Sequence, residues 1–156
     1  MYRNYALTPV FLPVEPRRDV AAAQKVASRL SCPYRLLDDT GTSAQTIGLL
    51  SRMAVVVSMR LHGLVFAAGQ GVPLVGVVYD QKVSAFLDYI GQDLYLDLDT
   101  LSASSLMERV EKACARIGDT EFLSKSVLRL RQVEGKNSET AKKLLGLDSV
   151  PGNEKD

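Results

Sequence analysis

Residues 54–87 read AVVVSMR, LHGLVFAAGQG, VPLVGVVYD and QKVSAFL, and this stretch decides the fold class. Residues 54–58 are apolar and β-branched without polar alternation, which is typical of a parallel strand that is buried on both faces. Residues 74–78 repeat this pattern, and apolar residues at helical spacing follow each run. Gly69, Gly71 and Pro73 end the first helical stretch. The sequence therefore predicts strand, helix, strand, helix.

The first strand-to-helix junction carries the residues best suited to bind an anion. Arg60 lies at the carboxyl end of the predicted strand, and His62, the only histidine, falls in the first helical turn. Ligands of open α/β sheets bind at this edge, and a helix amino terminus supplies free N–H groups and partial positive charge. We therefore predict a phosphate or carboxylate site. The alternatives are an ion pair of Arg60 with a surface acid and a hydrogen-bonded structural role for His62.

The second junction places three more polar residues near the same edge. Tyr79, Asp80 and Lys82 directly follow the strand at 74–78. Asp80 fits the N-cap of the next helix better than a catalytic role. Lys82 fits anion binding and a solvated helix start equally well.

Two further pairs of charged residues are expected at this edge. Arg17 and Arg18 follow the first predicted strand, although adjacent basic residues in a loop are usually solvated. Asp38 and Asp39 follow the next strand, and paired acids of this kind hold magnesium in receiver domains. That interpretation is disfavoured because the acids follow the wrong strand, and residues 58–60 supply no aspartate.

The rest of the chain predicts further alternation of strands and helices. The expected elements are a strand at 5–14, a helix capped by Asp19, a strand at 34–37, a helix capped by Ser43, a strand at 94–96, a long helix from Ser102 or Ser104, and two helices after Ile117 separated at Gly135 and Asn137. The predicted fold class is α/β: a doubly wound, mostly parallel, Rossmann-like sheet of about five strands. Residues 1–147 are expected to form one domain and residues 148–156 a disordered tail.

Composition excludes several classes of function. Among 156 residues, 46% are apolar and 24% charged, and 19 basic against 18 acidic residues give a net charge of +1. This balance gives no support for nucleic-acid binding. No apolar run reaches the roughly 20 residues that span a membrane, and the start lacks the apolar core of a signal peptide. Cys32 and Cys114 are isolated and are expected to be reduced, mostly buried thiols of a cytoplasmic protein.

The scarcity of histidine and cysteine limits the chemistry further. A histidine-rich zinc site cannot be built within one chain, and a Ser-His-Asp triad would have to use His62 without a Gly-x-Ser-x-Gly elbow. Neither a Walker A motif nor Gly-x-Gly-x-x-Gly is present. Ordinary NTPase and dinucleotide-binding functions are therefore disfavoured, and we expect no metal and no cofactor.

Residues 58–91 (SMRLHGLVFAAGQGVPLVGVVYDQKVSAFLDYIG) resemble the polysaccharide pyruvyl transferase family. The features in common are a strand ending in Arg-Leu-His, a small-residue helix, a Val-Pro strand and Tyr-Asp-x-Lys, in this order. A weaker resemblance extends from about Val10 to Ile117. It covers the carboxyl-terminal half of an architecture that resembles the two-domain GT-B fold, and the amino-terminal half is expected to be absent.

The resemblance implies a function and a set of roles. The family resemblance implies transfer of pyruvate from phosphoenolpyruvate to a sugar or lipid-linked saccharide, forming a ketal on a cell-surface polysaccharide. His62 is the expected catalytic residue, for proton transfer or for stabilising the departing phosphate. The expected substrate-binding residues are Arg60, Lys82, Tyr79 and Arg18. The missing amino-terminal domain would hold most of the acceptor, so this half alone is expected to be inactive, in the cytoplasm or at the inner face of the membrane.

Two other functions stay open at this point. A GT-B glycosyltransferase or sugar-nucleotide epimerase half would bind UDP- or GDP-sugars at the same edge. A non-catalytic interaction domain would instead use its apolar helices to dock. No predicted strand follows the helices after Ile117, so their apolar surface would stay exposed. We therefore also expect self-association as a homo-oligomer.

Overall fold

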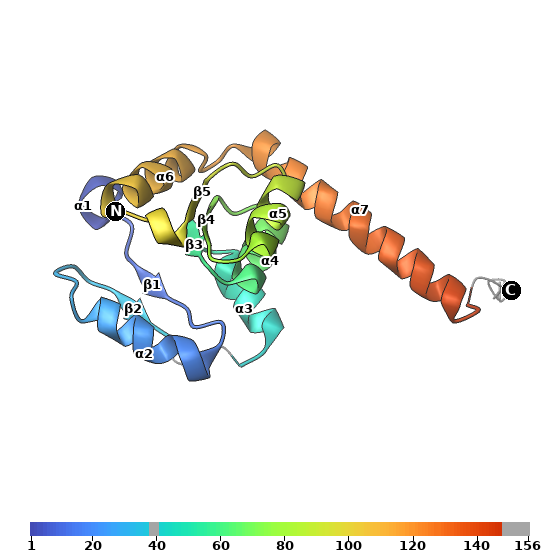
Figure 1. The fold of residues 1–156 in the computed structure, drawn as a ribbon, viewed down its shortest axis with the longest axis horizontal. Helices are drawn as coiled ribbons and strands as arrows, with labels where there is room; N and C mark the ends of the chain where they lie inside the picture. The colour runs from blue at the N-terminus through green and yellow to red at the C-terminus, as the bar shows by residue number, and fades with distance from the viewer. Residues whose placement is uncertain (38–40, 148–156) are drawn as a thin grey trace, which may run out of the picture.

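The computed structural model describes residues 1–37 and 41–147, and within them it is an α/β protein with parallel strands (Figure 1). The elements in chain order are α1 (Tyr2–Tyr5), β1 (Val10–Phe11), α2 (Pro16–Ala27), β2 (Arg35–Leu36), α3 (Ser43–Leu50), β3 (Val56–Ser58), α4 (Leu61–Gly69), β4 (Leu74–Val78), α5 (Gln81–Tyr89), β5 (Tyr95–Asp97), the 3-10 turn η1 (Leu98–Thr100), α6 (Ala103–Ala115) and α7 (Thr120–Leu144). The predicted fold class is confirmed, as is the number of strands among the described residues.

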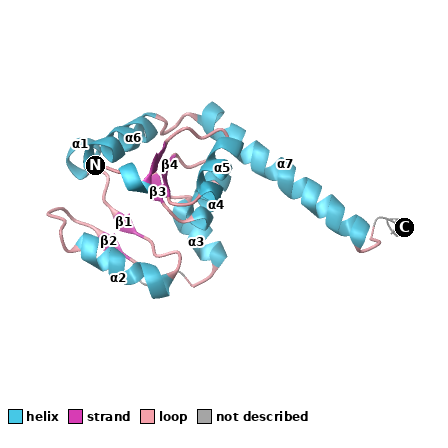
Figure 2. Ribbon diagram, in the orientation of Figure 1, coloured by secondary structure: helices cyan, strands magenta, loops and turns pink. Residues whose placement is uncertain are grey.

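The strands form two hydrogen-bonded groups instead of one continuous sheet. β3, β4 and β5 form a parallel three-stranded sheet in that order, and β1 and β2 form a separate parallel pair (Figure 2). The strand expected at 5–14 is reduced to Val10–Phe11, and residues 2–5 form a helical turn instead. The strand expected at 34–37 is likewise only Arg35–Leu36.

β4 is the centre of the molecule. All five of its residues are buried, as the apolar run predicts, and it pairs with a strand on each edge. β3 was also predicted to be buried on both faces, and this prediction is wrong: Val57 is 45% exposed. β3 pairs only with β4 among the described strands, so its other edge and part of its surface stay uncovered.

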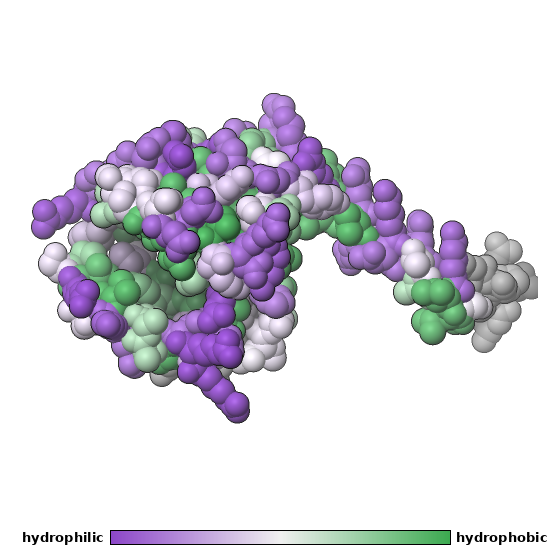
Figure 3. All heavy atoms as spheres, viewed as in Figure 1, coloured by the Kyte–Doolittle hydropathy of each residue, from purple (hydrophilic) through white to green (hydrophobic). Residues whose placement is uncertain are grey.

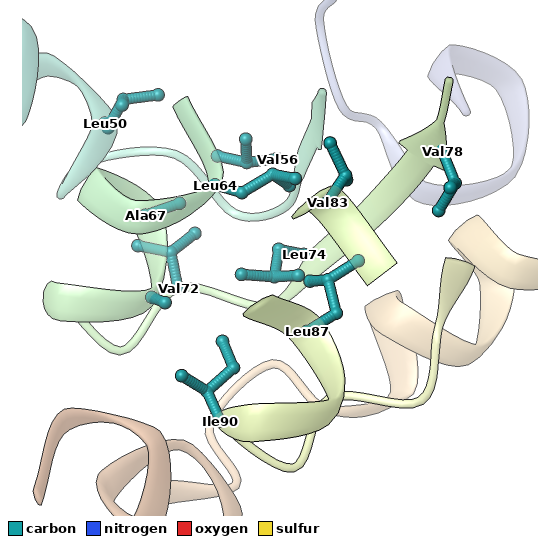
Figure 4. Close-up of a cluster of buried hydrophobic side chains, with 11 residues drawn as sticks. Leu50, Val56, Leu64, Ala67, Val72, Leu74, Val78, Val83, Leu87 and Ile90 are labelled. Carbon is teal, nitrogen blue, oxygen red and sulfur yellow. The ribbon is translucent and has the colours of Figure 1, made fainter. Parts of the chain in front are cut away.

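Side chains of β4 join two hydrophobic clusters on opposite faces of the sheet. Leu74 and Val78 pack among residues of α3, α4 and α5 (Figure 4). Val75 belongs to the second cluster, which also holds Leu94, Val110, Ala113 and Cys114. Because alternate residues of a strand point to opposite faces, one short strand supplies both layers of the core. Cys114 is buried and Cys32 is half-buried, and both are free thiols as predicted.

Two of three predicted helix starts differ from the observed ones, and the third is as predicted. α2 begins at Pro16, so Asp19 lies in the first turn, and its carboxylate accepts a hydrogen bond from the backbone N–H of the N-cap, Glu15. α3 is capped by Thr42, one residue before the predicted cap, because Thr42 and Gln45 form a reciprocal capping box. Ser102 caps α6 as predicted.

α7 is one continuous helix, which corrects the prediction of two helices. Gly135 is exposed, and a side chain there would contact nothing, so the helix passes through it. The base of α7 packs on α4 and is fixed by a buried hydrogen bond of 2.9 Å from Gln92 to Ser126. The rest of α7 projects away from the body (Figure 1), and Leu144 at its end is 83% exposed. Self-association through these helices stays a prediction.

No helix among residues 1–37 and 41–147 combines the length and apolar character needed to cross a membrane.

Replacing Gly76 by alanine tests the dependence of the fold on β4. A Cβ at Gly76 would collide with Leu87 and lie 3.3 Å from the Cβ of Tyr95. Gly76→Ala should therefore lower the free energy of unfolding by about 1–3 kcal/mol. Gly48→Ala is the matched control, because a Cβ at this exposed helical position would meet nothing within 4 Å. It should raise stability by roughly 0.5–1 kcal/mol. Urea denaturation of both variants measures the difference, and equal stabilities would contradict the packing described here.

Candidate functional site

Three helix amino termini gather at one edge of the molecule. α4 follows β3 and α5 follows β4, and these neighbouring strands run parallel, so their carboxyl ends meet at the same edge. The start of α2, which follows β1, joins them through ion pairs with Arg60. Each helix start contributes partial positive charge, so the edge favours anions as a whole.

The start of α4 is shaped by Ser58, which sequence reasoning did not single out. Arg60 is the N-cap residue, and its backbone N–H donates to the Ser58 hydroxyl oxygen at 3.0 Å. A Cβ at Gly63 would lie only 2.9 Å from the same oxygen, so a larger residue there would displace the Ser58 hydroxyl. The N–H groups of residues 61–63 have no hydrogen-bond acceptor among the described residues. They are therefore available to an anionic ligand.

The Arg60 guanidinium is held by two carboxylates of α2 and its N-cap. Asp19 Oδ1 accepts hydrogen bonds from Arg60 Nη2 at 2.6 Å and from Nε at 3.2 Å. Glu15 Oε2 lies 3.2 Å from Arg60 Nη1, and Glu15 Oε1 lies 3.2 Å from Arg18 Nε. This cluster of two arginines and two acids corresponds to the alternative interpretation of Arg60, an ion pair with surface acids. Its role in ligand binding stays a prediction.

The ion pair shifts the pKa values of both partners. Partial burial acts to raise the pKa of Asp19, but the hydrogen bonds from Arg60 and from the Glu15 N–H outweigh it, and the pKa is lowered. The pKa of Arg60 is raised, chiefly by its hydrogen bond to Asp19. Both groups are therefore charged at neutral pH, and the Arg60 side chain keeps 29% of its surface exposed.

Tyr79, Asp80 and Lys82 form a second small cluster at the start of α5. Asp80 is the N-cap, as predicted, and accepts a hydrogen bond of 2.9 Å from the Lys82 N–H. Lys82 Nζ lies 3.5 Å from Asp80 Oδ2 and 5.5 Å from the centroid of the Tyr79 ring. The charge of Asp80 is the main cause that raises the pKa of Lys82. Lys82 is 52% exposed and stays accessible to a ligand.

His62 projects from the first turn of α4 into solvent. Its ring lies 6.2 Å from the Phe66 ring, and it forms no hydrogen bond to any other residue in the described part of the chain. Both ring nitrogens are therefore open to a ligand. This differs from the hydrogen-bonded structural histidine that was the alternative interpretation.

The structure places the predicted residues on one edge but adds partners that the sequence did not reveal. Glu15 and Asp19 lie more than forty residues before Arg60 in the chain, and no local pattern signals the contact. Arg17 and Arg18 are exposed in the first turn of α2. Asp38 and Asp39 lie outside the described residues. Within residues 1–37 and 41–147, no group of three or more His, Cys, Asp or Glu is placed to hold a metal ion.

Comparison with known proteins identifies the matching family. Residues 2–81 match the model of the polysaccharide pyruvyl transferase family, which is 80 of the 156 residues. The match includes Arg60, His62 and Tyr79 and ends one residue before Lys82. A search of curated proteins gives no match.

The charge state of Asp19 makes the ion pair pH-dependent. A carboxyl group whose pKa is lowered by folding stabilises the protein above its unfolded pKa of about 4, and this contribution is lost as the pH falls through the folded value. Asp19→Asn should therefore lower the free energy of unfolding by about 1–2 kcal/mol at pH 7. The difference from the unsubstituted protein should shrink below about pH 4. Urea denaturation at pH 7 and pH 3 measures it, and a difference independent of pH would contradict the ion pair.

Proposed function

Because the chain belongs to the polysaccharide pyruvyl transferase family, we propose that this edge binds phosphoenolpyruvate and takes part in transferring pyruvate to a sugar. The observation that carries the proposal is the start of α4, where unpaired N–H groups, Arg60 and His62 lie together. The acceptor would be a sugar or lipid-linked saccharide of a polysaccharide, and the product a cyclic ketal. The same edge in an unrelated chain would suggest only an anion site, so the family supplies the identity of the donor.

The chemistry of phosphoenolpyruvate suits the groups at this edge. Its carboxylate and phosphate need two cationic partners, and Arg60 with the α4 amino terminus supplies one. Lys82, beside Tyr79 at the start of α5, supplies the other. Arg18 adds positive charge beside Arg60 through their shared partner Glu15.

The reaction requires one proton donor and one group that accepts developing charge. Protonation of the enol methylene carbon creates an electrophilic C2, a sugar hydroxyl attacks it, and the C2–O bond to phosphate breaks. A second hydroxyl then closes the ketal, and the two hydroxyl protons replace the proton consumed and protonate the released phosphate. An imidazole can donate or accept a proton at its ring nitrogens, so His62 suits either proton transfer or stabilisation of the departing phosphate.

An incoming anion competes with the carboxylates that already hold Arg60. Asp19 makes the shorter contact at 2.6 Å, whereas Glu15 lies at 3.2 Å and is 46% exposed. Glu15 is therefore the carboxylate that a ligand would displace, leaving Asp19 to fix the guanidinium. Exposed ion pairs contribute only up to about 1 kcal/mol. The loss of the Glu15 contact is therefore a small cost compared with the contacts that a ligand with two anionic groups would make.

Ligand-observed NMR with phosphoenolpyruvate tests the proposal directly. Binding should be detectable and should weaken by about tenfold or more in Arg60→Ala, because a charge-assisted contact is lost. Arg131→Ala on α7 is the matched control, since it removes the same charge at an exposed position on another element. UDP-N-acetylglucosamine serves as the competing ligand. Selective binding of the sugar nucleotide would favour the glycosyltransferase or epimerase alternative and contradict the proposal.

Glu15→Gln tests whether Glu15 competes with the donor. Removing this negative charge beside Arg60 and Arg18 should tighten phosphoenolpyruvate binding by about fivefold at low salt, and less at high salt. Titration of both proteins by NMR at two ionic strengths measures the effect. Weaker binding in Glu15→Gln would show instead that Glu15 supports the site.

A further inference from the structure

A slot of about 450 Å³ lies between the two groups of strands. Val10 of β1 and Leu12, directly after β1, line one side, and Val57 of β3 and Val55, directly before β3, line the other. Figure 3 shows a hollow bordered by hydrophobic residues in the part of the view where β1 lies. The slot therefore separates two strands that belong to one layer of the fold.

The two faces of the slot are already covered by apolar side chains. One face is lined by Leu50, the last residue of α3, and by Met53. The other face is lined by Val110 of α6 and by Met1. Leu50 and Met53 pack in the cluster above β4, whereas Val110 and Met1 pack in the cluster below it. The space is thus bounded by strand edges on two sides and by core side chains above and below, which is the environment of a central strand.

Backbone groups that point into the slot have no hydrogen-bond partners among residues 1–37 and 41–147. Pro9 and Phe11 bond to β2, so Val10 and Leu12 direct their polar backbone atoms to the opposite edge. Val56 bonds to Pro73, so Val55 and Val57 likewise face away from β4. Among the described residues, none of these four makes a backbone hydrogen bond at the slot. Unpaired edges of this kind are templates for another strand.

The order of the strands points to the same conclusion. Across the molecule the order is β2, β1, slot, β3, β4, β5. Doubly wound sheets have two common orders, 3-2-1-4-5-6 and 2-1-3-4-5, and the five strands would complete the second if β1 and β3 paired directly. They do not pair, and the slot lies between them, so the arrangement corresponds to the first order with its central position open.

We propose that the slot receives a β-strand from a polypeptide segment outside residues 1–156, running parallel to β1 and β3. The strand is extended, free of proline and apolar on both faces, and it joins the two groups into one six-stranded parallel sheet. An apolar small molecule would fill the volume but would leave the edges of Val10, Leu12, Val55 and Val57 unpaired. Residues 148–156 (DSVPGNEKD) are too polar to supply this strand, and the described residues are used elsewhere. The proposal does not depend on the identity of the anionic ligand.

A synthetic peptide tests the proposal on the whole chain. The probe is a heptapeptide of alternating valine and isoleucine with a lysine at each end, and binding is followed by NMR with amide hydrogen exchange. In the chain alone, the amides of Val10, Leu12, Val55 and Val57 should exchange rapidly. With the peptide, their exchange should slow by about tenfold or more. A nitroxide on the peptide amino terminus should broaden Ala54 more than Arg60, as a parallel strand requires.

Two matched controls separate strand pairing from apolar binding. The same peptide with alternate residues N-methylated keeps its side chains but loses its donors, so it should bind at least about tenfold more weakly. Val57→Pro removes a donor that faces the slot at an edge position that tolerates proline, and it should weaken binding similarly. Val57→Thr keeps the donor and should bind as the unsubstituted chain does.

Three results would overturn the proposal. The first is protection of these four amides in the chain alone, which would mean that β1 and β3 close the slot themselves. The second is equal binding of the N-methylated peptide, which would indicate an apolar ligand pocket. The third is the absence of peptide binding up to its solubility limit. Phosphoenolpyruvate titration of the same sample reports separately on the anion site.

Discussion

The arrangement of the whole molecule depends on the burial of one strand, β4. Its backbone groups need partners because water does not reach them, and β3 and β5 supply these partners on its two edges. Its side chains need apolar cover on both faces, which α4 and α5 supply on one side and α6 on the other. Since β3 and β4 must then run parallel in a fixed register, the loops after Ser58 and Val78 are brought to the same edge. The position of the candidate site is thus a consequence of core packing.

At that edge, charge is balanced locally before any ligand arrives. Arg60 and Arg18 face Glu15 and Asp19, so two cations are matched by two carboxylates. The pairing fixes the orientation of the Arg60 guanidinium and prevents repulsion between two arginines in the free protein. The net binding free energy of an anion at Arg60 is therefore the difference between the contacts that the anion makes and the contacts that Glu15 loses. The amino terminus of α4 favours the anion further, because it has no side-chain cap and no acidic residue in its first turn, whereas Asp80 caps α5 and Asp19 lies in the first turn of α2.

The sequence was sufficient for elements that are specified by local patterns, and insufficient where distant residues decide the outcome. The buried strand at 74–78, its neighbouring helices, and the N-caps Asp80 and Ser102 follow from periodicity and capping chemistry. The continuity of α7 through Gly135 was missed because an exposed glycine only weakens a helix, and packing of the helix base on α4 outweighs this cost. The contacts of Arg60 with Glu15 and Asp19 were missed because they join segments that fold together only through the sheet. The division of the strands into two groups has no local signal at all.

The slot and the candidate site share a wall. Ser58 and Gly63 line the slot and also shape the start of α4, and Val57, which faces the slot, lies three residues before Arg60. In doubly wound sheets, ligands bind where the strand order reverses, which is the carboxyl end of the central position. A strand in the slot would therefore end beside the unpaired N–H groups of α4 and would restrict the loop that carries Arg60. If the strand and the anion favour the same orientation of this loop, each increases the affinity of the protein for the other, and by the same factor. The anion site and the open sheet position are in this sense two parts of one structural element, β3 with the turn that follows it.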